Sequence, residues 1–349
     1  MSFYVEQADL FLLAIGGIAA LMLPHRKRVL ALLLLTLVIA FAAKDYYAAP
    51  RPCADNPLFC LPSYGFPSIH AAAATIVAFA SIGASLFYLF APAAALIAAS
   101  RFAFGVHSLL QVAAGVALGA GVWIAASEIL EALKKRRERK ALGQRKLSAR
   151  EAHAAVPRGF GSAFRFELKR QASHIVFGVA VIAIALAFGR EAALAALLAS
   201  LASGIVIMQF AACGVRFFPI DWALRVFERK NAKPGWGALN FVVGALFALS
   251  FSQSLAFGCA VIAILAFGDA FSTLIGLAFG FTRAHGAKSW EGFAGFVGAA
   301  FIASFALVGW QAALFYSVVL GFVELVDFKV NDNLLIPIVA VMLRQFTGI

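Results

Sequence analysis

Three short groups of basic, hydroxyl and histidine residues lie within the first third of the chain. They are Lys44-x6-Arg51-Pro52, Pro67-Ser68-Ile69-His70 and Ser100-Arg101-x5-His107. Cations neutralise the non-bridging oxygens of a phosphate, a serine hydroxyl hydrogen-bonds to them, and a histidine attacks phosphorus or protonates a leaving oxygen. Together these residue types supply what phosphate-ester cleavage needs without a metal ion. The first third of the chain is therefore predicted to carry a phosphate-ester hydrolase site.

Further polar clusters lie in the C-terminal half of the chain, between long apolar runs. They are Glu167-Leu168-Lys169-Arg170 with Ser173-His174, Arg225 to Lys233, Gly268-Asp269 with Ser272 and Gly276, Lys288-Ser289-Trp290-Glu291-Gly292, and Glu324 to Asn333. In our interpretation Lys169, Arg170 and Lys288 hold nucleotide phosphates. Asp269, Glu291 or Asp332 would hold Mg²⁺. Because no Walker A pattern is present, these residues alone predict only an anionic cytosolic ligand with a divalent cation.

Long apolar runs separate these polar residues and must position them. The runs identify an integral membrane protein. The chain has 349 residues, of which 63% are hydrophobic and 13% charged; soluble domains are about half apolar and a quarter charged. The runs that begin at Ala71, Pro234 and Gly292 exceed the roughly 20 residues of one crossing, so each is predicted to form a helical hairpin. The expected turns are Tyr88 to Pro92, Phe251 to Ser254 and Gly309 to Gln311.

These hairpins predict an all-α, polytopic fold of about twelve transmembrane helices in two helical-bundle halves, joined by a basic cytoplasmic linker. The first hairpin has a direct consequence for the hydrolase site. A straight helix would separate His70 from His107 by about 55 Å, whereas a hairpin returns both to one rim of the membrane.

The charge distribution gives an orientation. The formal net charge is +12, from 29 basic and 17 acidic residues. Cytoplasmic loops of membrane proteins are enriched in Lys and Arg, so the basic stretch 133–164 is expected inside. All but five of the 29 basic residues then lie inside; the exceptions are Lys44, Arg51, Arg101, Arg190 and Arg344. Nucleic-acid binding is not expected, because little besides charge supports it.

The three groups of the first third resemble the type 2 phosphatidic acid phosphatase family over about residues 40 to 111. The resemblance implies that His107 attacks phosphorus to form a phosphohistidine and that His70 protonates the leaving alkoxide, with no cofactor. It also implies phosphate binding by Lys44, Arg51, Ser68 and Arg101.

The chain departs from this family at two positions. Ile69 replaces a glycine that lets the backbone approach the phosphate. Gln111 replaces an aspartate four residues after the nucleophile, on the same helix face. Gln111 can accept the Nδ1–H of His107 and orient it, but it brings no charge to stabilise an imidazolium. Weakened phosphatase activity is therefore predicted.

The four cysteines divide into two pairs. Cys53 and Cys60 flank the loop between the first two groups on the oxidising side, where a disulfide between them is one possibility. Cys213 and Cys259 lie in or beside apolar spans and are interpreted as packing residues.

The clusters of the other half resemble the CTP-dependent lipid kinases, which include dolichol, phytol and diacylglycerol kinases, over about residues 165 to 345. The resemblance rests on Glu-Leu-Lys-Arg-x3-His at 167–174, Gly-Asp-Ala-x5-Gly at 268–276, Lys-Ser-x-Glu-Gly at 288–292 and Asn-Asp-Asn-x3-Pro at 331–337. It implies transfer of the CTP γ-phosphate to a membrane alcohol with Mg²⁺, and Asp269 as metal ligand or base. The implied nucleotide-binding residues are Lys169, Arg170, Gly268, Gly276, Lys288, Ser289, Glu291 and Gly292, and the implied metal ligands are Asp269, Glu291 and Asp332.

The combined hypothesis is a bifunctional enzyme of the cell membrane. The phosphatase-like domain at 1–132 would have its site on the outer side of the membrane. The linker at 133–164 and the site of the kinase-like domain at 165–349 would lie on the cytoplasmic side. The expected partners are membrane lipids: a polyprenol, a polyprenyl phosphate or diphosphate, or diacylglycerol and phosphatidate. A phytol kinase, a phosphatidate cytidylyltransferase-like enzyme and a lipid flippase or sensor remain alternatives.

Overall fold

The computed structural model describes residues 21–23, 25–53, 60, 63–141, 161–215, 218, 233–282, 284, 288–326 and 328–348. All of the secondary-structure elements in these ranges are helices, which confirms the all-α expectation. In chain order they are α2 (Arg26–Tyr47), α3 (Ile69–Ala80), α4 (Phe87–Ala103), α5 (Leu109–Ala141), α7 (Ser162–Phe188), α8 (Arg190–Ala212), α10 (Trp236–Phe251), α11 (Leu255–Ala263), the π-helix η1 (Ile264–Gly268), α12 (Asp269–Phe279), α13 (Trp290–Val308), α14 (Trp310–Leu325) and α15 (Asp332–Thr347). Most of the first predicted span, and linker residues 142–160, lie outside the described residues.

Helix length corrects the expected number of membrane spans. Within the described ranges, six helices are long and apolar enough to cross a membrane: α2, α5, α7, α8, the continuous helix Leu255–Phe279 and α13. Helices α3, α4, α10 and α14 are apolar but shorter, with 10–17 residues. At 1.5 Å per residue such helices reach only about 15–26 Å, less than the roughly 30 Å of hydrocarbon. A polytopic membrane protein is supported, but about twelve full spans was wrong.

Two of the three predicted hairpin turns are confirmed. Helix α10 ends at Phe251 and α11 begins at Leu255, and Gly309 separates α13 from α14. The third prediction is wrong, because Tyr88 and Pro92 lie inside α4. The chain turns instead at 81–86, where Gly83 has a φ of 85° that other residues rarely adopt.

The described residues form two compact units, each with its own core. One comprises residues within Met1–Ile124 together with Leu194–Val215, and the other residues within Ala125–Ala193 and Arg216–Ile349. Helices α5 and α8 each contribute to both units. The first unit thus includes most of α8, which the predicted boundary at 165 assigns to the second domain; the predicted boundaries themselves stay a prediction.

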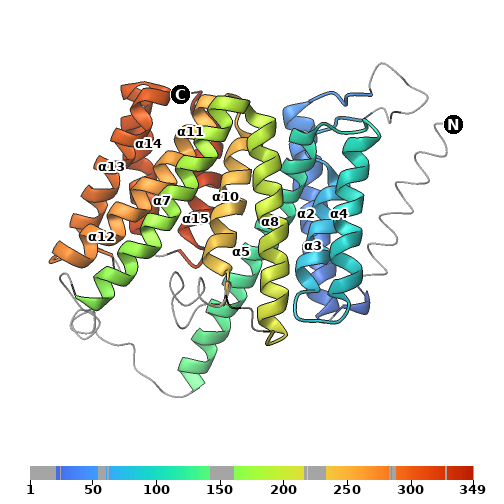
Figure 1. The fold of residues 1–349 in the computed structure, drawn as a ribbon, viewed down its shortest axis with the longest axis horizontal. Coiled ribbons are helices and arrows are strands. Elements are labelled where there is room, and N and C mark those ends of the chain that lie inside the picture. Colours follow the sequence, from blue (N-terminus) through green and yellow to red (C-terminus); the bar gives the residue numbers. More distant parts are fainter. Residues whose placement is uncertain are drawn as a thin grey trace. The chain divides into compact units, whose positions relative to one another are not determined.

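In the first unit, a close helix contact brings two motifs together. Helix α3 packs beside α2 and α4 (Figure 1), and its start lies against α5. Gly115 and Gly119 form a Gly-x-x-x-Gly pair on α5, and a Cβ at either would lie 2.3 Å from the carbonyl oxygen of Ser68 or Ala72. Glycines at this spacing let helix backbones approach closely in a membrane. The contact fixes the start of α3 beside the start of α5.

In the second unit, a long helix crosses the core and changes its winding at the predicted site. It begins as α11, runs through η1 and continues as α12 from Asp269. Single π-turns inside α-helices are rare and occur often at functional sites. Helix α13 packs along α12 and α14, while α10 packs along α15. The start of α15 and the start of α12 therefore lie in one region of this unit.

Candidate functional site

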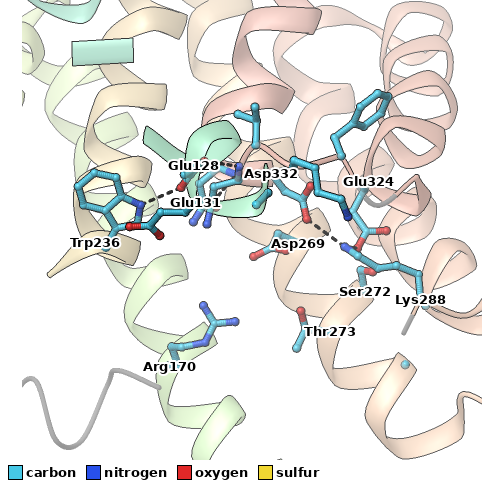
Figure 2. Close-up of a pocket in the computed structure, with 18 of the residues that line it drawn as sticks. Glu128, Glu131, Arg170, Trp236, Asp269, Ser272, Thr273, Lys288, Glu324 and Asp332 are labelled. Carbon is cyan, nitrogen blue, oxygen red and sulfur yellow. Dashed lines mark hydrogen bonds and ion pairs between the residues drawn. The ribbon is translucent and has the colours of Figure 1, made fainter. Parts of the chain in front are cut away.

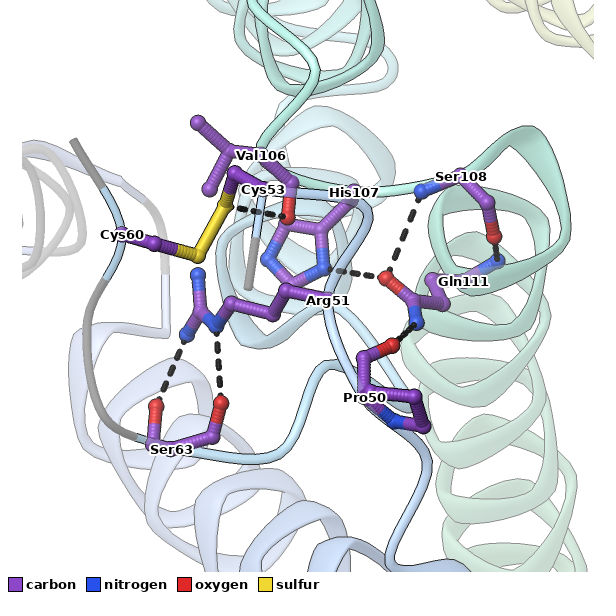
Figure 3. Close-up of a disulfide and its surroundings, with 9 residues drawn as sticks. All are labelled: Pro50, Arg51, Cys53, Cys60, Ser63, Val106, His107, Ser108 and Gln111. Carbon is purple, nitrogen blue, oxygen red and sulfur yellow. Dashed lines mark hydrogen bonds between the residues drawn. A yellow bond between two sulfur atoms is a disulfide. The ribbon is translucent and has the colours of Figure 1, made fainter. Parts of the chain in front are cut away.

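In the first unit, His107 lies in the turn just before α5 with its side chain buried, 2% exposed. Its Nδ1 is 3.0 Å from Oε1 of Gln111 (Figure 3). The amide of Gln111 is itself oriented, because its Nε2 donates to the carbonyl oxygen of Pro50 at 2.8 Å and Oε1 accepts from the backbone N–H of Ser108 at 3.3 Å. An amide oxygen only accepts, so Nδ1 of His107 carries the proton and Nε2 keeps its lone pair. Nε2 is thus the ring nitrogen whose lone pair is available for a new bond.

The surroundings keep this imidazole neutral. Burial, together with the positive charges of Arg51, Lys44 and His70, lowers the pKa of His107 from 6.5 to about 3, against the raising effect of the Gln111 hydrogen bond. The same effects show that the structure brings these three predicted residues within electrostatic reach of His107. A neutral histidine is the form that attacks phosphorus.

Two buried cations come from the end of α2 and the segment after it. Lys44 lies in the last turn of α2, 5% exposed, and its Nζ donates to the carbonyl oxygen of Tyr64. The guanidinium of Arg51, 8% exposed, donates from Nε to the carbonyl oxygen and from Nη2 to the hydroxyl of Ser63, both at 3.0 Å (Figure 3). The segment around Ser63 therefore positions both cations beside His107.

The second predicted motif opens α3. Ser68 is the N-cap residue of α3 and fully buried, and its hydroxyl has no hydrogen-bond partner among the described residues. Its backbone N–H donates to the carbonyl oxygen of Gln111 at 2.9 Å. A buried hydroxyl without a partner is costly unless a ligand satisfies it, and helix N-termini favour anions. This position suits a phosphate oxygen. Ile69 and the half-buried His70 follow as the first two residues of α3.

The third motif connects α4 to α5. Arg101 lies in the last turn of α4, and its carbonyl oxygen accepts from the backbone N–H of His107 at 3.0 Å. Gly105 makes this tight connection possible with a φ of 67°. The structure thus brings residues of all three motifs together: Lys44, Arg51 and His70 act electrostatically on His107. Arg101 and Ser68 are tied to His107 and Gln111 through backbone hydrogen bonds.

The loop that carries Arg51 is covalently closed. Cys53 and Cys60 form a disulfide with a Cα–Cα distance of 5.5 Å (Figure 3); residues 54–59 between them lie outside the described ranges. Such a link restricts the unfolded chain and thereby stabilises the folded loop. Cys213 is exposed and Cys259 is buried, and both are free.

Sequence reasoning missed Gly65, which supports Gln111. A Cβ at Gly65 would lie 2.5 Å from Nε2 of Gln111, so only glycine fits without displacing the amide that orients His107. The Gly-x-x-x-Gly pair at Gly115 and Gly119 was also missed, although its spacing is a readable signal.

The second unit contains a polar pocket of about 650 Å³. Asp269, Glu324 and Asp332 enter it from α12, α14 and α15, with ligand oxygens within 4.8 Å of one another. Nζ of Lys288 bonds to the carboxylates of Glu324 and Asp332, at 2.9 Å for Asp332 (Figure 2). Three carboxylates and one ammonium thus share one corner of the pocket.

Burial and the neighbouring charges perturb the ionisation of the groups in this cluster. Burial, with the nearby carboxylates of Asp269 and Glu324, raises the pKa of Asp332 to about 7 against the lowering effect of Lys288. The pKa of Lys288 is raised, because the attraction of Asp332 and Glu324 outweighs the lowering by burial. Glu324 is 2% exposed, and its Oε2 has no hydrogen-bond partner among the described residues. Carboxylate oxygens are the ligands that a hard divalent cation such as Mg²⁺ prefers. A bound cation would also give the buried Oε2 of Glu324 a partner.

The structure brings together most, but not all, of the residues predicted for this site. Those that line the pocket are Arg170, Asp269, Gly276, Lys288, Ser289, Gly292 and Asp332. Gly268 packs against the ring of Phe296, and Lys169 is exposed outside the lining. Glu291 also lies outside it, because its carboxylate accepts from the backbone N–H of Thr282 at 2.9 Å. Glu324 stands in the cluster where Glu291 was predicted.

Helix α5 supplies residues to this pocket that sequence reasoning missed. Glu128 accepts from Nε1 of Trp236 and from the backbone N–H of Asn331, each at 2.8 Å (Figure 2). Asn331 directly precedes Asp332. Glu131 lines the same pocket and pairs with Lys233. Glu128 therefore holds the segment that carries one carboxylate of the cluster.

Comparison with known proteins supports part of this picture. Residues 27–135 match the PAP2 superfamily model, and this range contains His70, His107 and Gln111. An uncharacterized protein of Methanocaldococcus jannaschii is 27% identical over 175 residues, which cover 50% of this chain and 90% of that protein. No solved structure matches the chain.

Proposed function

We propose that the first unit is a lipid phosphatase that works through a phosphohistidine at His107. The observation that carries the proposal is the buried, neutral imidazole, oriented by Gln111 with Nε2 available, beside Lys44 and Arg51. The PAP2 superfamily match over 27–135 points to the same chemistry on lipid phosphates.

The reaction would run in two displacements. Nε2 of His107 attacks the terminal phosphorus and the bond from this phosphorus to the leaving oxygen breaks, while His70 gives its proton to that oxygen. The leaving group is the lipid alcohol of a monophosphate or the lipid monophosphate of a diphosphate. Water then attacks the phosphohistidine, His70 takes a proton from the water, and inorganic phosphate leaves. Lys44, Arg51, Arg101 and the hydroxyl of Ser68 would hold the phosphate oxygens in both steps. The proposed substrate is a polyprenyl phosphate or diphosphate on the outer side of the cell membrane, with phosphatidate as the alternative.

The test is phosphate release by purified, full-length protein in lipid. Wild-type protein is expected to release phosphate from a polyprenyl phosphate, polyprenyl diphosphate or phosphatidate, and to carry acid-labile label after a short incubation with ³²P-labelled substrate. His107→Ala should abolish both signals. Release that persists in His107→Ala would contradict the proposal.

For the second unit we propose phosphoryl transfer from CTP to a polyprenol, supported by side-chain chemistry alone. Asp269, Glu324 and Asp332 fit a divalent cation, and Arg170 and Lys288 line the same pocket for phosphates. Mg²⁺, when bound, would neutralise charge on the transferred phosphoryl group. The lipid hydroxyl would attack the γ-phosphorus of CTP, CDP would leave, and Asp269 would hold the metal or accept the hydroxyl proton. Diacylglycerol or phytol phosphorylation, or cytidylyl transfer, are the alternatives.

Labelled nucleotides distinguish these reactions. With γ-labelled CTP and Mg²⁺, label is expected in the extracted polyprenol, more than with ATP, and Asp269→Asn should remove it. Label from α-labelled CTP in the lipid would instead indicate cytidylyl transfer. No conversion of any lipid in wild-type, His107→Ala and Asp269→Asn proteins alike would favour a flippase or sensor.

A further inference from the structure

An apolar cavity of the first unit lies between α4, α5 and α8, and it is open at its sides, since lining residues such as Tyr88 and Phe102 are more than half exposed. Its volume is about 760 Å³, which is within the range of small-molecule sites. Thr75, Tyr88 and Gln209 are the polar residues of its lining, and all other lining residues are apolar. Such a lining has little to offer a polar ligand, whereas it suits a hydrocarbon.

One wall of the cavity lies outside the segment that matches the PAP2 superfamily. Lining residues of α8 run from Ala195 to Phe210, whereas the match ends at residue 135. Gln209 fastens α8 to the turn before α4: its Oε1 accepts from the N–H of Gly83 at 2.7 Å, and its Nε2 donates to the carbonyl oxygen of Ala84 at 3.3 Å. These hydrogen bonds hold α8 in place as one wall of the cavity.

The cavity is elongated along α4. Its lining on that helix extends from Phe87 to Phe102, which corresponds to about 22 Å of helix, most of the roughly 30 Å of membrane hydrocarbon. Between these ends the α4 lining consists mainly of alanine, so the helix leaves room for a long, thin ligand.

One end of the cavity adjoins the phosphate site. The lining residue Phe102 follows Arg101, and the lining residue Val112 follows Gln111, the partner of His107. The chain of a lipid whose phosphate is bound at His107 would therefore start near this end of the cavity. An amphiphile with a phosphate head and one long chain matches this arrangement of polar and apolar surface.

We infer that this cavity holds the hydrocarbon chain of the lipid phosphate, with α8 as the wall that sets the preference for long chains. This inference rests on the proposed phosphatase activity of His107. Helix α8, which lies in the C-terminal half of the sequence, would thus select substrates for the phosphatase site in the N-terminal half.

The test compares two substrates in full-length protein. Ala202→Phe fills the cavity from α8, and Ala199→Phe is the matched control, because Ala199 is exposed on the same helix and outside the lining. The measured quantity is the ratio of kcat/KM for a long-chain polyprenyl phosphate to that for a water-soluble, ten-carbon prenyl phosphate. The ratio should fall at least tenfold in Ala202→Phe and stay within twofold in Ala199→Phe.

Ala95→Phe, from the α4 wall, should reproduce the effect. An unchanged ratio in both cavity variants would overturn the inference, whatever their absolute rates. If wild-type protein releases phosphate from neither substrate, the phosphatase proposal fails, and the cavity is then tested by binding alone. A long-chain polyprenyl phosphate with a photoreactive terminus should label peptides of 87–102 and 195–210; labelling elsewhere would overturn the inference.

Discussion

At the scale of single residues, the first site depends on an amide where a carboxylate would strengthen catalysis. Gln111 orients His107 and selects its tautomer, but an imidazole that becomes positively charged gains no charge partner from it. Carboxylates that orient catalytic histidines contribute as much as about 10⁴-fold in rate. The same amide is held by Pro50 and Ser108, so its geometry is well fixed even though its charge is neutral.

We therefore expect Gln111→Asp to raise kcat for lipid phosphate hydrolysis at least tenfold. Gln111→Leu removes the acceptor altogether and should lower kcat at least 100-fold, since Nδ1 of His107 then loses its partner. Both values come from steady-state phosphate release. An unchanged kcat in Gln111→Asp would show that the charge of this residue does not limit the reaction.

The pH dependence of the same reaction follows from the environment of His107. Its pKa is lowered to about 3 by burial and by Arg51, Lys44 and His70, and attack requires the neutral form. As pH falls, kcat/KM should therefore hold until below about pH 5 and show no acidic limb near 6.5. Gln111→Asp, by stabilising the imidazolium, should move the acidic limb toward neutral pH. A wild-type limb near 6.5 in kcat/KM would mean that His107 of the free enzyme is not shielded in this way.

At the scale of helices, the contact between α3 and α5 builds the phosphate site. Gly115→Val would place side-chain atoms against the carbonyl oxygen of Ser68, already 2.3 Å from an added Cβ. Overpacking of this kind costs about 1–3 kcal/mol. The variant is expected to lower Tm in detergent by several degrees and to abolish phosphate release. Gly298→Val is the control, because no atom lies within 4 Å of a Cβ there; an equal loss of Tm in both would contradict the packing argument.

The C-terminal part of α5 positions the segment before α15 in the second unit. Glu128 accepts from the backbone N–H of Asn331, and Glu128→Gln replaces one acceptor oxygen with a donor. We expect this change to lower CTP-dependent lipid labelling about tenfold while phosphate release by the first unit changes less than twofold. Glu138→Gln is the control on the same helix, since Glu138 is exposed and pairs only weakly, at 3.9 Å from Lys134. Equal effects of Glu128→Gln and Glu138→Gln on lipid labelling would show that Glu128 has no specific role in this site.

At the scale of the whole molecule, the charge distribution predicts the sides of the membrane. We expect a membrane-impermeant maleimide to label Phe104→Cys in intact cells, because Phe104 is 78% exposed and lies by the predicted outer motif. Arg136→Cys, at an exposed position near the end of α5 within the basic stretch, should react only after permeabilisation. Both changes belong in a Cys213→Ser background, since Cys213 is exposed. The reverse labelling pattern would place the phosphatase site in the cytoplasm.

Composition and the lengths of the apolar runs were enough to predict an all-α membrane protein. Two turns, at Phe251–Ser254 and Gly309, were readable from polar or glycine residues. One phosphate site was likewise predicted from the order of Lys44, Arg51, Ser68, Arg101 and His107. Basic, hydroxyl and histidine residues that occur together at a membrane edge have few functions other than phosphate binding. The turn near Gly83 was missed, since Pro92 is a strong turn signal that α4 nevertheless accommodates.

The tertiary structure decided which distant side chains meet. Glu291 and Glu324 are equivalent carboxylates in the sequence, yet a backbone N–H of Thr282 binds the first, whereas packing of α14 turns the second into the pocket. The same holds for Glu128 and for α8, whose partners lie more than 100 residues away along the chain. Residue types determine what chemistry is available locally, but contacts between helices depend on packing over the whole bundle, which no local pattern encodes.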